Sequence, residues 1–169
     1  MAGFVNVTGP VVADTVYSNN KLVAKDVGFT LPAVTPMTAE VQAMGTMSVP
    51  IPQRLENMEL AITKIGTDEG LTAMLSFDAF PIEIRWVQSV TDANGKTSHI
   101  GCKAFLRCMS NGIPEIGGTP GEATENEMPY TVTRYQMMQD GKEAWLIDRL
   151  AGICRIGGKD YMSNINSML

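Results

Sequence analysis

Apolar and polar residues alternate along several stretches of the chain after residue 54, and this pattern constrains the fold more than any other feature. Between residues 55 and 64 the apolar side chains recur at every second position, at Met58, Leu60 and Ile62. Residues 82–90 and 100–109 show the same alternation. Successive side chains of a β-strand point to opposite faces, so each stretch predicts a strand with one buried face. The chain is therefore predicted to be mainly β.

Two short turn sequences connect predicted strands into hairpins. Residues 92–95 (Asp-Ala-Asn-Gly) lie between the strands at 82–90 and 100–109, and Asn-Gly tolerates the positive φ angles of a tight primed turn. Residues 140–141 (Asp-Gly) likewise join residues 130–138 to residues 143–150. The sequence thus predicts two antiparallel hairpins.

A single segment has the pattern of a helix. Residues 67–69 (Thr-Asp-Glu) offer an N-cap and first-turn acids, and Leu71, Met74 and Leu75 follow at helical spacing. Gly70 weakens the prediction, since glycine inside a helix costs about 1 kcal/mol relative to alanine. We expect one helix of two or three turns, packed against the sheet.

The remaining segments lack a regular pattern. Residues 32–52 contain four of the nine prolines, and residues 112–127 are acidic and rich in glycine. Proline removes a backbone donor, so the first of these segments cannot hold a continuous central strand. We expect a single domain over residues 1–169. It comprises an N-terminal arm at 1–18, a long ordered or partner-dependent loop at 32–52 and a flexible loop at 112–127.

Composition excludes several classes of protein. The net charge of −5 and the pI near 4.8 argue against a surface that neutralises nucleic-acid phosphates. No apolar run approaches the roughly 20 residues that cross a bilayer, so direct membrane insertion is not expected. The first residues lack the pattern of a secretory signal, which predicts a protein of the cytoplasm. Cys102, Cys108 and Cys154 are odd in number and form no Cys-x-x-Cys pair, so reduced thiols are expected.

The catalytic and ligand-binding motifs that this sequence suggests are all incomplete. His99 is the only histidine, and no Gly-x-Ser-x-Gly elbow accompanies it. Residues 95–97 (Gly-Lys-Thr) lack the earlier glycine of a phosphate-binding loop, and the acids do not fall at metal-ligand spacings. We expect neither an enzyme nor a cofactor or metal site.

From Tyr17 onward, a strand ending in Leu-Pro leads into a long loop, and a strand, an Asp-Gly-Lys-Glu turn and a strand ending in Ile-Asp follow near the end. In this order the features resemble the major tail tube proteins of contractile-tailed phages, the P2-like family. The chain departs from the family at Arg107-Cys108, where the family usually has Arg-Gly. The segments that carry the resemblance are residues 21–34, 44–51, 55–65, 80–85, 135–143, 146–148 and 157–160.

The resemblance implies an antiparallel β-sandwich or barrel with one short α-helix. It also implies rings of six copies that stack into the hollow inner tube of a contractile phage tail or of a tail-like injection particle such as a bacteriocin. The tube would be a conduit for DNA or would puncture membranes. Its expected partners are further copies of itself, sheath, baseplate, tape-measure and tail-terminator proteins, with assembly in the host cytoplasm and the mature protein in the virion or particle. The alternative is a monomeric β-barrel module that binds a ligand or acts as an adaptor.

Two groups of residues are the candidate functional sites. Apolar residues of the 32–52 segment are expected to contact another subunit: Met37, Val41, Met44, Met47, Val49 and Ile51. Acids on the polar faces of the predicted strands are expected to line the lumen of the tube: Glu59, Glu83, Glu143 and Asp148. Like-charge repulsion from these acids would let a phosphate backbone slide through.

Overall fold

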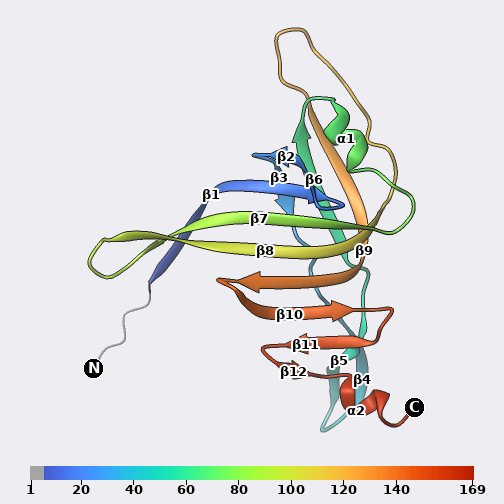
Figure 1. Cartoon of the computed structure of the whole chain (residues 1–169). Helices are drawn as coiled ribbons and strands as arrows, with labels where there is room; N and C mark the ends of the chain where they lie inside the picture. The colour runs from blue at the N-terminus through green and yellow to red at the C-terminus, as the bar shows by residue number, and fades with distance from the viewer. Residues whose placement is uncertain (1–5) are drawn as a thin grey trace.

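The computed structural model describes residues 6–169, and nearly all of its regular structure is antiparallel β-sheet (Figure 1). The predicted mainly-β fold is confirmed. The strands are β1 (Val7–Ser18), β2 (Lys21–Lys25), β3 (Gly28–Thr30), β4 (Pro36–Gln42), β5 (Thr46–Leu55), β6 (Glu59–Ile65), β7 (Phe80–Thr91), β8 (Thr97–Ser110), β9 (Glu125–Gln139), β10 (Lys142–Asp148), β11 (Ile153–Ile156) and β12 (Lys159–Asp160). The helices are α1 (Glu69–Ala73) and α2 (Ser163–Asn166).

The main sheet has the strand order β12-β11-β10-β9-β8-β7-β1-β2. Strand β9 is long enough to pair with two strands along one of its edges. Its first half pairs with β6 and its second half with β10. Strand β3 extends the β6 side. The rings of Phe29 on β3 and Trp86 on β7 lie 5.1 Å apart, so the β3–β6 part folds back onto the β7 part. The apolar core lies between them.

The alternating residues occupy the positions that the sequence predicts. Met58, Leu60 and Ile62 are buried, as are the inward residues of the β7–β8 hairpin. The Asp140-Gly141 turn has φ angles of 48° and 75°, which is the primed geometry expected for a tight hairpin. The 92–95 connection differs from the prediction, because Gly95 alone among these residues has a positive φ. A longer loop forms instead, and the Asp92 carboxylate stabilises it by accepting hydrogen bonds at 2.9 Å from the backbone N–H groups of Asn94 and Lys96.

The predicted helix forms but is shorter than two or three turns. Asp68 is its N-cap and accepts a hydrogen bond from the Leu71 N–H at 3.1 Å. A Cβ atom added at Gly70 would lie 2.3 Å from the Val23 carbonyl oxygen, so close packing against β2 requires glycine there. The second helix, α2 near the C-terminus, was not predicted.

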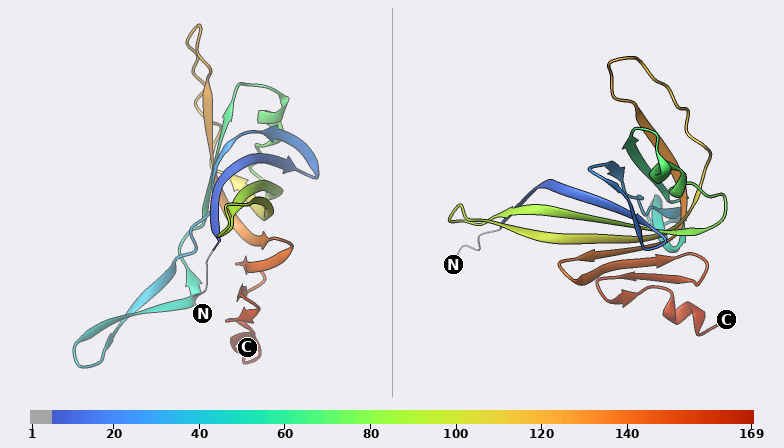
Figure 2. Two further views of the ribbon diagram at one scale, coloured as in Figure 1. Left: turned by 90° about the vertical axis from the view of Figure 1, so that its left-hand side faces the viewer. Right: turned by 45° about the horizontal axis from the view of Figure 1, so that its top comes forward.

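The prediction of a long loop at 32–52 is wrong, because the segment forms the β4–β5 hairpin. Its two strands pair only with each other, so both are edge strands that tolerate Pro36 and Pro50. Met44 and Gly45 make the turn with φ angles of 53° and 121°. Figure 2 shows the hairpin projecting away from the body of the molecule.

Two other predicted boundaries also change. Residues 7–18 of the predicted arm form strand β1, which pairs with β7 through several bulges; residues 1–5 lie outside the described residues. The irregular segment at 112–127 ends earlier than predicted, because β9 begins at Glu125. Within residues 6–169, no helix is both long and apolar enough to cross a membrane.

Candidate functional site: an apolar hairpin and a charged sheet face

The β4–β5 hairpin has one apolar face that the rest of the chain leaves largely uncovered. Cross-strand pairing places Met37 opposite Ile51 and Val41 opposite Met47, with Ala39 and Val49 between these pairs. All of these side chains lie on one side of the two-stranded sheet because they alternate along both strands. The polar residues occupy the other side. Met37, Val41 and Met47 are 44–49% exposed, and Met44 at the turn is fully exposed.

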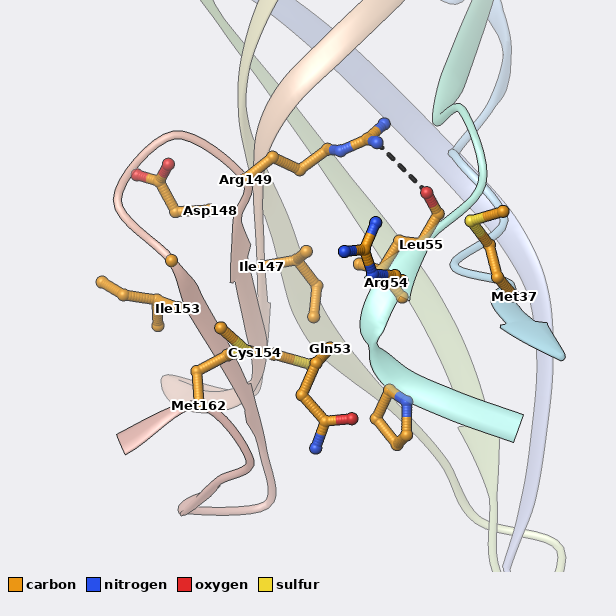
Figure 3. Close-up of a pocket in the computed structure, with 12 residues that line it drawn as sticks. Met37, Gln53, Arg54, Leu55, Ile147, Asp148, Arg149, Ile153, Cys154 and Met162 are labelled. Carbon is orange, nitrogen blue, oxygen red and sulfur yellow. Dashed lines mark hydrogen bonds between the residues drawn. The ribbon is translucent and has the colours of Figure 1, made fainter. Parts of the chain in front are cut away.

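The hairpin is fastened to the body only at its base (Figure 3). The Arg149 guanidinium donates hydrogen bonds to the carbonyl oxygens of Leu55 at 3.1 Å and Glu56 at 3.3 Å. Leu55 packs against the core, and a groove of about 260 Å³ separates the base of the hairpin from β10 and β11. The base is therefore fixed while the remainder of the hairpin projects.

All four acids that the sequence assigns to the lumen lie on the sheet face opposite the core. Three of them are Glu83 on β7, Glu143 on β10 and Asp148 at the end of β10. Glu59 shares this face on β6, where it lies opposite Thr131 of β9 and accepts a hydrogen bond from Asn57 at 3.1 Å.

Each of these three acids has an arginine beside it. Glu83 pairs with Arg85, Glu143 Oε1 lies 2.7 Å from Arg155 Nε, and Asp148 Oδ2 lies 3.8 Å from Arg134 Nε. The hydrogen bond from Arg155 lowers the pKa of Glu143, which keeps this carboxylate ionised. The three acids therefore act as partners of arginines rather than as free negative charges.

Two further cations share the same face without an acidic partner in residues 6–169. Lys103 lies opposite Arg85, and Arg107 lies opposite Arg134, so like charges face each other across neighbouring strands. Such pairs are destabilising unless counter-charges lie nearby. Within β7–β11 this face holds five cations and five acids: Arg85, Lys103, Arg107, Arg134 and Arg155 against Glu83, Glu125, Glu127, Glu143 and Asp148.

The thiols and the histidine supply no activated nucleophile to these surfaces, although Cys154 lines the groove at the base of the hairpin. All three cysteines are free and buried, and burial raises the pKa of the Cys108 thiol to about 12. A thiol with so high a pKa is a poor nucleophile at neutral pH. His99 lies on the exposed face of β8 near the hairpin turn, and no group of three or more metal-ligating side chains occurs in the part of the chain described here.

A comparison with protein families shows to which family the chain that carries these surfaces belongs. The sequence model of the phage tail tube protein FII family matches residues 12–169. The chain belongs to the phage tail tube protein family. It is accordingly a structural tail tube protein and not an enzyme.

A solved structure of similar shape agrees with the fold. One chain of the cryo-EM structure of an extracellular contractile injection system, the PVC sheath-tube complex in the extended state, is 12% identical with a TM-score of 0.52. The match covers 77% of this tail tube protein and 90% of that chain. A chain of the PVC sheath/tube terminator in the extended state is 15% identical with a TM-score of 0.45, covering 76% of this chain and 95% of that one. No curated protein matches.

Sequence reasoning missed Ala39 and Arg149 as parts of the hairpin surface. The signal for the first was present, because residues 37–41 and 47–51 alternate strictly between apolar and polar types. Four prolines in the segment obscured that pattern. Arg149 had no signal, because its partners are carbonyl groups more than 90 residues away in sequence.

Proposed function

We propose that six copies of this tail tube protein form a ring and that the rings stack into the inner tube of a contractile tail or tail-like injection particle. The observation that carries this proposal is the uncovered apolar face of the β4–β5 hairpin. A soluble monomer gains nothing by exposing aligned methionine and valine side chains, whereas burying each one fully is worth about 1.5–3 kcal/mol. The hairpin face is the surface that another subunit covers.

The same proposal assigns partners and location. The similarity to a chain of a sheath-tube complex supports a sheath around the tube. Terminator, baseplate and tape-measure proteins are the further expected partners. Residues 1–169 act as one tail tube domain, made in the host cytoplasm and incorporated into the virion or particle.

Electron microscopy and amide exchange test the assembly together. Purified protein should form rings or tubes, and amides of β4 and β5 should be protected more strongly in tubes than in the monomer. Uniform small monomers at high concentration would instead indicate a β-barrel binding module. Equal protection of the hairpin in both states would place it outside the subunit interface.

We also propose that the face bearing Glu83, Glu143 and Asp148 lines the passage, together with Glu59 on the same face. The arginine partners change the expected mechanism, because a paired acid no longer repels a passing DNA backbone as a free charge. Lys103 and Arg107, which have no acidic partner in residues 6–169, are then the attractive sites on this face. Replacing Glu143 with glutamine leaves Arg155 unpaired and should slow DNA passage, and screening should weaken this effect as salt rises. A triple E83Q/E143Q/D148N tube that delivers DNA at the normal rate contradicts this assignment.

A further inference from the structure

The sheet face opposite the core contains a hollow of about 300 Å³. It is lined by residues of β1, β7, β8 and β9, which are neighbours in the main sheet, and by the β1–β2 turn (Figure 1). Tyr17 of β1 and Phe105 of β8 lie on either side of β7 in this hollow, and Asn19 and Asn20 of the turn also line it. All of these residues belong to one chain, so a single copy forms the hollow completely.

Two arginines face each other at this hollow. Arg107 of β8 lies directly opposite Arg134 of β9, and both line the hollow. Directly opposed residues of an antiparallel pair have Cβ atoms about 4.5–5.5 Å apart, and like charges there destabilise the sheet. The Arg107 guanidinium has no acidic partner within residues 6–169. A negative group between the two guanidiniums would therefore relieve a repulsion that the fold contains.

The second arginine is only weakly engaged by its own chain. Arg134 Nε lies 3.8 Å from Asp148 Oδ2, which is too far for a hydrogen bond, and Arg134 Nη2 donates to Gln136 Oε1 at 3.4 Å. A guanidinium carries more N–H donors than these two contacts use. The facing arginines thus offer several N–H groups to one ligand.

The acids closest to the hollow do not cancel the two arginines. Glu83 also lines the hollow, but its carboxylate pairs with Arg85. Asp148 lies on β10, on the side of Arg134 that faces away from Arg107. Arg85, Arg107 and Arg134 together exceed Glu83 and Asp148 by one positive charge.

The next charged residues outward leave this excess unchanged. Lys21 follows the β1–β2 turn and Asp78 lies two residues before β7, so they contribute one charge of each sign. Lys103 on β8 and Glu59 on β6 lie on either side of the arginine pair along the strands, again one of each sign. The hollow is therefore a locally positive part of a face whose charges otherwise balance.

We propose that this hollow binds a phosphate group between the guanidiniums of Arg107 and Arg134. One guanidinium fork matches two oxygens of a phosphate, and the remaining oxygens of the tetrahedral group are presented to the second guanidinium. A planar carboxylate is satisfied by one arginine, so a facing pair favours phosphate. A cavity on the order of 150 Å³ holds a benzene-sized group, so the hollow has room for a phosphate and its waters. Asn19 and Asn20 bring further amide donors to it.

The inference deepens the proposed assignment of this face to the passage. Where nucleic acid occupies the passage, its backbone supplies the phosphates, and contacts to phosphate oxygens position a nucleic acid without reading its sequence. One such site in each copy would hold the polymer in place until a force moves it. Free phosphate is the other source of the same ligand.

Titration of the dilute, unassembled full-length chain at constant ionic strength tests the site. Inorganic phosphate exchanged for chloride should raise the melting temperature of the wild type with a saturable dependence on phosphate concentration. R107Q should weaken this binding by about tenfold or more, because a hydrogen bond to a charged group is worth at least that factor. R107Q should also be at least as stable as the wild type in chloride, since the repulsion between the strands is gone.

K103Q is the matched control. Lys103 is an unpaired cation on the same strand and face, but it does not line the hollow. It lies four residues from Arg107, about 13 Å along β8, which exceeds the screening length of about 10 Å at 0.1 M salt. K103Q should therefore bind phosphate within about twofold of the wild type.

Dimethyl phosphate separates the two sources, because it is a diester with a single charge like the DNA backbone. Saturable binding of dimethyl phosphate assigns the site to the backbone, whereas binding of inorganic phosphate alone assigns it to free phosphate. The proposal is overturned if neither ligand gives a saturable effect, if R107Q and K103Q weaken binding equally, or if R107Q is less stable than the wild type in chloride. Failure of the protein to form tubes would contradict the proposed function and leave this titration unaffected.

Discussion

The hydroxyl of Tyr130 joins α1 to the sheet through a single buried hydrogen bond. It donates to the Met74 carbonyl oxygen at 2.7 Å, and both residues are completely buried. Burial raises the pKa of Tyr130 well above its usual range, so the hydroxyl remains a neutral donor at every pH at which the protein is handled. Met74 is the C-cap residue of α1, and its own N–H donates to the Leu71 carbonyl oxygen at 3.2 Å.

Tyr130→Phe removes this donor without changing the ring that packs in the core. The Met74 carbonyl then stays buried without its partner, which costs about 1–3 kcal/mol of unfolding free energy. For a domain of this length each kcal/mol lowers the melting temperature by about 2–4 °C, so we expect a decrease of roughly 2–12 °C. The change should also loosen α1, which forms one wall of an apolar groove of about 380 Å³ against residues 110–116.

Urea denaturation of the dilute monomer measures this loss, and amide exchange of residues 68–75 locates it. Tyr161→Phe is the matched control, because its hydroxyl makes no hydrogen bond within residues 6–169 and its loss should change stability by less than about 0.5 kcal/mol. If Y130F is no less stable than Y161F, the hydrogen bond does not have the role assigned to it. If amide exchange in α1 of Y130F matches that of the wild type, the lost hydrogen bond does not loosen the helix.

Three further outcomes follow from other buried positions. Gly70→Ala should destabilise the protein by about 1–3 kcal/mol in thermal denaturation, because its Cβ would overlap the Val23 carbonyl; an unchanged melting temperature contradicts this packing. Burial raises the pKa of Asp14, so the ionised carboxylate destabilises the folded state, and stability falls as pH rises from the unfolded pKa near 3.8 through the higher folded pKa. D14N should therefore be more stable than the wild type at pH 7, and the difference in stability should vanish below the unfolded pKa. Cys108 should resist a thiol reagent until the chain unfolds, and rapid labelling in the native monomer would show that its strand opens.

Local sequence patterns predicted the parts of the fold that depend on near neighbours. Strict alternation identified the buried faces of β6, β7 and β8, and Asp140-Gly141 identified its turn by residue type alone. The cap at Asp68 was also local, because the acceptor and the donor lie three residues apart. Each of these features is fixed by the chemistry of one short segment.

The candidate sites depended on both the local sequence pattern and the tertiary structure. The sequence identified the apolar residues of the 32–52 segment and assigned them to contacts with another subunit, which stays a prediction. Its prolines were interpreted as a loop, although a two-stranded sheet with only edge strands accommodates them. The acids of the sheet face were identified as exposed, but their arginine partners were not. Arg155 lies 12 residues from Glu143 and Arg134 lies 14 residues from Asp148, on neighbouring strands.

The sequence by itself determined strands β6 to β10, the β7–β8 and β9–β10 hairpins and which of their side chains face the core, because alternation and turn chemistry act between adjacent residues. Only the tertiary structure decided the charge of the outer sheet face, the projection of the β4–β5 hairpin and the groove between α1 and residues 111–116. These properties arise when strands distant in sequence are placed side by side. Pairing register then decides whether an acid meets an arginine or solvent, and whether an apolar face is covered or left for another subunit.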